Sequence, residues 1–167
     1  MNNQEELFER CVEKDLEKEI SLLEQKDGPY DINMGTLANG CRKGNTKAVK
    51  FLIEEIKLFL NPNEKDGLLC LLAAISNGHE EIVEILVRNG ANIDLADILG
   101  WTPLIFAAYY RHIDIVRFLI EQGADVEVKD IQGRTFIQYL NKRDQEMIGN
   151  FIEDLEYRKA MIKPNRK

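Results

Sequence analysis

The sequence predicts an all-α protein built as a solenoid of stacked helix–turn–helix units. Two observations carry this prediction. Turn residues and amphipathic helical spacing alternate within residues 97–129, and the same pattern recurs about thirty-three residues away on either side. Helices this short are not stable alone in water, so each unit has to bury its apolar face against its neighbours.

Residues 97–129 hold the clearest unit. Gly100 supports a tight turn, and Thr102–Pro103 fixes the entry into a first helix, because proline suits the first turn of a helix. A break at Arg111–His112 separates the two helices, and Gly123 ends the second, since glycine tolerates a left-handed cap. Apolar residues at helical spacing mark the core side of both helices: Leu104, Ala107, Ala108, Ile115, Val116, Leu119 and Ile120.

Copies of this unit emerge when the sequence is shifted by about thirty-three positions. The backward shift aligns four marker residues: Gly67 with Gly100, Leu71 with Leu104, Ala74 with Ala107 and His79 with His112. The forward shift aligns turn and apolar residues of another copy: Gly133, Thr135, Ile137, Ile148, Phe151 and Ile152. Leu140 and Asn141 replace the alanine pair in that copy, so the period persists while the small residues are lost.

The combined pattern GWTPL, AA, H, IV, L and GAD resembles the ankyrin repeat, a turn–helix–helix unit of about thirty-three residues. The resemblance implies an ankyrin-repeat solenoid that forms a single domain over residues 1–157, followed by a basic tail over residues 158–167. The repeats are expected at about residues 1–30, 31–63, 64–96, 97–129 and 130–157. The first and last are expected to be degenerate caps, because the first carries an acidic outer face and the last turns polar.

One segment departs from the family pattern. Ile56, Leu58, Phe59 and Leu60 stand where the second repeat should end in Gly-Ala. We expect a lengthened helix or an altered loop there, with apolar residues that need a packing partner or form an exposed patch.

Composition indicates a folded, acidic domain. Hydrophobic residues make up 44% and charged residues 31% of the 167 residues, which suits one soluble domain. No apolar run approaches the roughly 20 residues of a membrane span, and the N-terminal segment is acidic where a signal peptide is basic and then apolar, so we expect no membrane association and a cytoplasmic location. The net charge of −7 argues against nucleic acid and favours a partner protein with a basic patch.

No motif predicts catalysis, a cofactor or a metal site, so we do not expect an enzyme. The cysteines, Cys11, Cys41 and Cys70, lack C-x-x-C spacing and lie on apolar helix faces, which is typical of small buried side chains. The two histidines aligned above are expected to bond to neighbouring backbone between repeats. Val83 stands where a zinc-binding helix would need its second histidine.

The resemblance implies that the turn tips and the exposed side of the first helices form a concave face that binds another protein. The variable positions of the central repeat are apolar or aromatic: Ile98, Leu99, Trp101, Tyr109 and Tyr110. Neighbouring repeats supply the expected rim: Asp66, Leu68, Ser76, Asn77, Lys129, Ile131, Gln132, Arg134, Lys142 and Arg143. We interpret the apolar residues as a binding surface, because Trp and Tyr are enriched at interface hot spots. The alternative is that they pack against adjacent tips or the last repeat.

The sequence therefore predicts a non-catalytic module, monomeric when alone, that binds one partner protein through its concave face. Its expected role is that of an inhibitor or of an immunity-type protein that occludes a toxin, with the acidic N-terminal cap steering a basic region of the partner. The alternative is an adaptor that links a client protein to a larger assembly, which the apolar patch at residues 56–60 favours.

Overall fold

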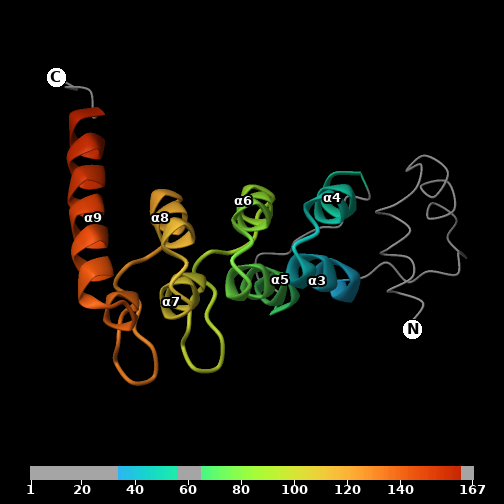
Figure 1. Cartoon of the computed structure of the whole chain (residues 1–167), viewed down its shortest axis with the longest axis horizontal. Helices are drawn as coiled ribbons and strands as arrows, with labels where there is room; N and C mark the ends of the chain where they lie inside the picture. The colour runs from blue at the N-terminus through green and yellow to red at the C-terminus, as the bar shows by residue number, and fades with distance from the viewer. Residues whose placement is uncertain (1–33, 56–64, 163–167) are drawn as a thin grey trace, which may run out of the picture. The chain divides into compact units, whose positions relative to one another are not determined.

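A computed structural model describes residues 34–55 and 65–162 of the chain (Figure 1). The predictions for the acidic first repeat, for Cys11, for the apolar patch at residues 56–60 and for the end of the basic tail lie outside the described residues. Every regular element within the described ranges is helical, which confirms the all-α class. The chain divides into two compact parts, Met1–Ala91 and Asn92–Lys167, here named the N-half and the C-half.

Two helical hairpins make up the described part of the N-half. α3 (Met34–Lys43) is followed by α4 (Thr46–Lys50), which η1 (Phe51–Glu55) continues as a wider π-helical turn. α5 (Lys65–Ser76) and α6 (Glu80–Arg88) form the second hairpin. α3 packs on α5 and α4 packs on α6, so equivalent helices of successive repeats stack (Figure 1). The residues that fill the core are fully buried: Leu37, Cys41, Val49, Leu71, Ile75, Val83 and Leu86.

Side-chain contacts join the two described hairpins of the N-half, among them the ion pair of Lys50 with Glu81 at 2.9 Å. Cys41 and Cys70 are buried thiols, as predicted. A hydrogen bond with Cys70 and burial both raise the pKa of the Cys41 thiol, so this thiol stays protonated. His79 Nε2 lies 3.2 Å from the carbonyl oxygen of Arg42, which confirms the predicted bond from a histidine to the backbone of the preceding repeat.

Gly44 lies in the turn between α3 and α4. Both its backbone conformation and the space around it favour glycine. Its φ is 73°, and a Cβ added there would collide with the His79 ring. Gly44→Ala is therefore expected to lower the free energy of unfolding by about 1–3 kcal/mol, measured by urea denaturation. Gly123→Ala is the control for the backbone effect alone, because Gly123 has φ 93° and its added Cβ would meet nothing within 4 Å. Equal losses in the two variants would contradict the packing role of Gly44.

The first hairpin of the C-half follows the prediction for residues 97–129. α7 (Pro103–Tyr109) and α8 (Ile113–Glu121) are separated by a short turn. Thr102 caps α7, since its hydroxyl accepts a hydrogen bond from the Ile105 N–H at 3.4 Å, and proline occupies the first turn. The predicted apolar stripe is buried along both helices: Leu104, Ala107, Ala108, Ile115, Val116, Leu119 and Ile120.

The last repeat is atypical. Its first helix is η2 (Phe136–Tyr139), a single 3₁₀ turn that packs on α7, and its second is α9 (Lys142–Ile162), which packs on α8 (Figure 1). Gln145 Nε2 donates hydrogen bonds to the carbonyl oxygens of Ile137 (3.0 Å) and Leu140 (2.9 Å). The Ile137 carbonyl oxygen also accepts the Leu140 N–H at 3.2 Å, so the α9 side chain adds a second hydrogen bond there and ties the end of η2 to α9.

The predicted exposure of Leu68 at the rim is wrong. α5 begins at Lys65, so Gly67 lies inside a helix and Leu68 is only 7% exposed. Leu69–Cys70 is the sequence equivalent of Thr102–Pro103, and it contains neither a capping hydroxyl nor a proline to fix the helix start. The helix therefore extends toward its N-terminus and carries Leu68 into the core.

α9 crosses the predicted boundary between domain and tail at residue 157. It continues to Ile162, and Arg158 pairs with Asp154 one turn earlier. The first proline of this region is Pro164, so no helix-breaking residue stands at the expected boundary. Residues 158–162 thus extend the last helix instead of beginning a separate tail.

Candidate functional site

Two turn tips of the C-half, one before α7 and one before η2, share the same construction. Each is closed by an aspartate, Asp97 or Asp130, whose Oδ1 accepts hydrogen bonds from the backbone N–H groups two and four residues further on, at 2.8 and 2.9 Å. The Ile131 N–H donates to the Leu99 carbonyl oxygen at 3.1 Å, and a Cβ added at Gly100 would lie 3.1 Å from the Asp130 Cα. The tips are therefore fixed side by side.

The tips and the end of α7 hold large apolar side chains in solvent. Ile98 is 90% exposed and Ile131 is 68% exposed. Leu99, Tyr109 and Tyr110 are about half exposed. These five residues are named the apolar surface below.

An aromatic cluster includes the two tyrosines of this surface and packs against them. It consists of Trp101, Phe106, Tyr109, Tyr110 and Tyr139. The Trp101 ring centroid lies 5.2 Å from that of Phe106, 5.0 Å from that of Tyr109 and 5.2 Å from that of Tyr139. Such tilted and edge-to-face contacts stabilise the rings. Half-buried Trp101 thus packs against the last repeat, which was the alternative interpretation for this residue, whereas Tyr109 and Tyr110 stay accessible.

Asp130, Arg134 and Tyr139 form an ionic network under the second tip. Arg134 Nε and Nη2 each donate to Asp130 Oδ2 at 3.2 Å, and the Tyr139 hydroxyl donates to the same oxygen. The Arg134 guanidinium also lies 4.5 Å from the centroid of the Tyr139 ring. Burial opposes ionisation of Asp130, but hydrogen bonds from Tyr139, two backbone N–H groups and the Arg134 side chain outweigh it and lower the pKa of Asp130 to about 2. Arg134 therefore holds the tip in place.

The other predicted site residues separate by location. Four are exposed in the C-half: Lys129, Gln132, Lys142 and Arg143. Ser76 and Asn77 lie in the N-half at the end of α5, where Asn77 Nδ2 donates to the Ala73 carbonyl oxygen at 2.8 Å. The structure thus gathers the apolar tips, the tyrosines and four polar rim residues within one half.

Sequence reasoning missed three residues near the apolar surface: Phe106, Tyr139 and Arg111. Arg111 has φ 61°, a left-handed conformation that Gly44 and Gly78 adopt with φ 73° in the equivalent turns of other repeats. The replacement of a repeated glycine by arginine was a visible signal in the sequence. Arg111 Nη2 lies 3.1 Å from Asp144 Oδ2, in the first turn of α9.

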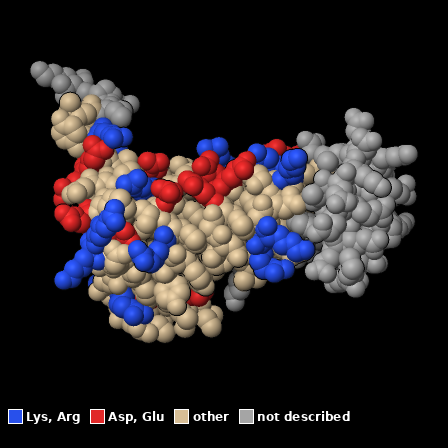
Figure 2. Space-filling model, viewed as in Figure 1, with Lys and Arg blue, Asp and Glu red and all other residues tan. Residues whose placement is uncertain are grey.

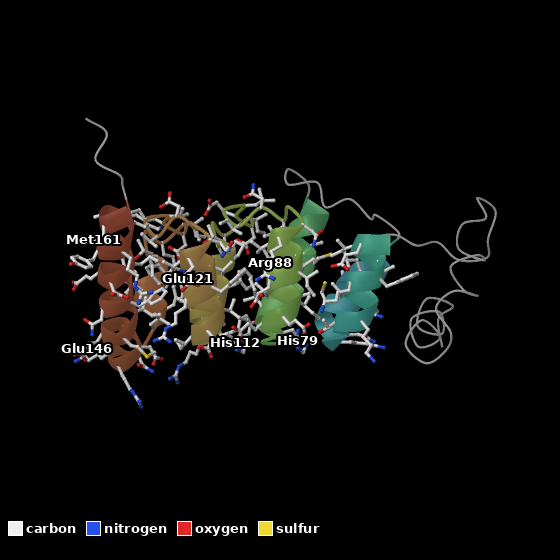
Figure 3. The ribbon with its side chains drawn as sticks, turned by 90° about the horizontal axis from the view of Figure 1, so that it is seen from above. His79, Arg88, His112, Glu121, Glu146 and Met161 are labelled. Carbon is white, nitrogen blue, oxygen red and sulfur yellow. The ribbon has the colours of Figure 1, made fainter. Side chains whose placement is uncertain are left out.

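Charge is distributed unevenly over the C-half. Figure 2 shows Lys and Arg side chains gathered over η2 and the beginning of α9, whereas Asp and Glu lie along α8 and further along α9. Figure 3 places Glu146 and Met161 toward opposite ends of α9, and His112 and Glu121 at opposite ends of α8. The His112 ring stacks on Tyr110 with 6.4 Å between ring centroids. Arg111 directly follows Tyr110 and contacts Asp144 in the first turn of α9, so the tyrosine end of the apolar surface adjoins this basic region.

The described residues present no metal-binding cluster of His, Cys, Asp and Glu. None of the helices in residues 34–55 and 65–162 combines the length and apolar character needed to cross a bilayer.

Comparison with known proteins finds relatives that match part of this chain. The chain is 39% identical to the Notch-regulated ankyrin repeat-containing protein of Xenopus tropicalis over 71 residues, which are 41% of this chain and 62% of the relative. It is 38% identical to protein phosphatase 1 regulatory subunit 27 of Mus musculus over 66 residues, 40% of this chain and 43% of the relative. The chain thus spans less than two thirds of the length of these two relatives.

A family description of ankyrin repeats in three copies matches residues 8–97 and residues 37–130. Each match covers more than half of the chain, and the matched residues include both described hairpins of the N-half and the α7–α8 hairpin of the C-half. The chain therefore belongs to the ankyrin repeat family.

Proposed function

We propose that this protein binds one partner protein through the apolar surface of its C-half and thereby blocks or sequesters that partner. The observation that carries the proposal is the exposure of large apolar side chains on rigid tips. Ile98 is 90% exposed and Ile131 is 68% exposed, although both belong to turns whose backbone is closed by aspartate hydrogen bonds. Contiguous exposed apolar groups on a preorganised backbone are typical of protein interaction sites.

The nature of the relatives supports a regulatory role. One of them carries the name of a regulatory subunit of a phosphatase. A small module whose described residues hold no metal-binding cluster acts most simply by covering a site on its partner. We therefore propose inhibition by occlusion, with no chemistry of its own.

Replacing Tyr109 and Tyr110 together with alanine is expected to weaken partner binding by about 2 kcal/mol or more, because tyrosines are frequent hot-spot residues. The measurement is capture of proteins from the source cell by wild type and variant, followed by a titration of the captured protein. Tyr157→Ala is the matched control, because Tyr157 is a 65% exposed tyrosine on α9 outside the apolar surface. Unchanged helical circular dichroism is required of both variants.

Two outcomes would contradict the proposal. Equal affinity of the wild type and the double tyrosine variant for the partner would show that the apolar surface does not take part in binding. Full activity of the partner when it is saturated with this protein would exclude inhibition by occlusion.

An adaptor role is a second candidate, favoured by a separate apolar feature. Tyr157 and Met161 are 65% and 70% exposed and lie four residues apart on α9, so they share one helix face. An adaptor would use this face for a second protein. Formation of a ternary complex that Tyr157→Ala abolishes, while binary binding through Tyr109 and Tyr110 persists, would favour the adaptor over the inhibitor.

A further inference from the structure

Three exposed bases lie near Tyr109 and Tyr110, at one end of the apolar surface. Arg111 follows the two tyrosines in the chain, and its contact with Asp144 brings the beginning of α9 beside them. Lys142 and Arg143 are exposed on that first turn of α9. Asp144 is only 10% exposed and already paired with Arg111. Two exposed acids also lie near these bases: Glu146, four residues after Lys142 on α9, and Asp114 in the first turn of α8. The three exposed bases outnumber these two exposed acids, so the tyrosine end of the apolar surface carries a net positive charge.

Arg111 occupies a strained position that folding alone does not explain. Its φ of 61° places the Cβ close to the backbone carbonyl, whereas Gly44 and Gly78 adopt the same conformation without that contact. The ion pair with Asp144 leaves the Arg111 side chain 62% exposed. Exposed ion pairs contribute little to stability, so the pair is a weak reason to keep arginine where glycine fits. Strained residues of this kind concentrate at binding sites.

We propose that the apolar surface and its basic margin bind an acidic segment of the partner that also carries apolar or aromatic side chains. The apolar groups of such a segment contact Tyr109, Tyr110 and the tips, and its carboxylates meet Arg111, Lys142 and Arg143. This inference rests on the proposed function and adds the chemical class of the partner. It differs from the expectation of a basic patch, which came from the net charge of −7 of the whole chain. Charges beyond about 8 Å are screened at physiological salt, so the local basic residues decide which segment docks.

Selection from a random peptide library on the full chain tests the chemical class directly. Peptides that bind the wild type are counter-selected on the Tyr109→Ala, Tyr110→Ala variant, so that only peptides directed to the apolar surface remain. We expect the retained peptides to be enriched in Asp and Glu together with Trp, Phe or Leu. The strongest one that contains no Trp is then synthesised with a twin in which every Asp and Glu is replaced by Asn or Gln. Trp101, the single tryptophan of the chain, reports both titrations by fluorescence.

The twin is expected to bind about tenfold more weakly, and raising the salt from about 0.1 M to about 1 M should remove most of that difference. Lys142→Gln should lower the affinity for the acidic peptide several-fold and leave the affinity for its amide twin unchanged. Lys159→Gln is the matched control, since Lys159 is also an exposed lysine of α9 but lies near the other end of the helix. It should change neither affinity.

Arg111→Gly separates binding from folding. Glycine relieves the left-handed strain, so the melting temperature is expected to stay the same or rise, while affinity for the acidic peptide falls several-fold. A lower melting temperature with unchanged affinity would assign Arg111 to folding through Asp144 and overturn its role at the surface.

The outcomes distinguish this inference from the proposed function. Retained peptides that are neutral or basic would overturn the acidic partner class and leave the apolar surface as a binding site. Failure to enrich any peptide that depends on Tyr109 and Tyr110 would instead count against the proposed function, and the inference would fall with it.

Discussion

Leu119→Ala is expected to reduce the free energy of unfolding by about 2–5 kcal/mol, because the deleted methyl groups lie in a closed core. Leu119 is 0% exposed on α8 and belongs to the apolar stripe that also includes Ile115 and Val116. α8 packs on both α7 and α9, so a cavity there loosens the interface between the central repeat and the last one. Urea denaturation followed by circular dichroism and by Trp101 fluorescence measures the loss.

Leu99→Ala is the matched control for this loss. Leu99 is 44% exposed on the first tip, so removal of the same atoms should change the free energy of unfolding by less than about 0.5 kcal/mol. A Leu119→Ala effect as small as the Leu99→Ala effect would contradict the placement of Leu119 in the core.

The central repeat was predictable because its signals are local. Thr102 and Pro103 fix the start of α7, and Gly123 with φ 93° follows the end of α8. These residues act within one turn of the backbone they control. Spacing and turn chemistry therefore sufficed to place both helices and the buried stripe between them.

The Leu68 error shows what an alignment by period alone leaves out. The shift by about thirty-three residues places Leu68 under Trp101, but α7 begins after Trp101 and α5 begins before Leu68. Helix start depends on the capping residues, and those differ between the two repeats. Equivalent sequence positions thus lie in a turn in one repeat and in a helix in the other.

The support of the site could not be read from the sequence, because it depends on contacts between repeats. Tyr139 enters the aromatic cluster only because η2 packs on α7, which brings its ring to 5.2 Å from that of Trp101. The sequence identified the exposed tyrosines by their position in the repeat. It did not show that Trp101 would be half-buried against the last repeat, since residue spacing carries no information on burial by a partner element.

The ionic network of Asp130, Arg134 and Tyr139 within the last repeat makes Asp130→Ala the most damaging single change expected at the turn tips. The substitution removes the acceptor of the Gln132 and Arg134 backbone N–H groups and leaves the Arg134 guanidinium without its carboxylate. We expect a clear fall in melting temperature and faster backbone hydrogen exchange at the second tip. Asp97→Ala is the matched comparison, because Asp97 closes the first tip with the same two backbone bonds. Equal losses would show that the Arg134 and Tyr139 contacts contribute nothing.

The pH dependence of the unfolding free energy provides an independent test of the ionic network of Asp130, Arg134 and Tyr139. Folding lowers the pKa of Asp130 from its ordinary 3.8 to about 2, so the native state favours the ionised form. The stabilisation is therefore complete above about pH 4 and is lost as the pH falls toward 2, when the carboxylate takes up a proton in both states. Asp130→Asn cannot ionise, so the difference in unfolding free energy between wild type and this variant should shrink over that interval. A difference that stays constant from pH 5 to pH 2 would show that ionised Asp130 does not hold the tip, and the rigidity of the apolar surface would then need another source.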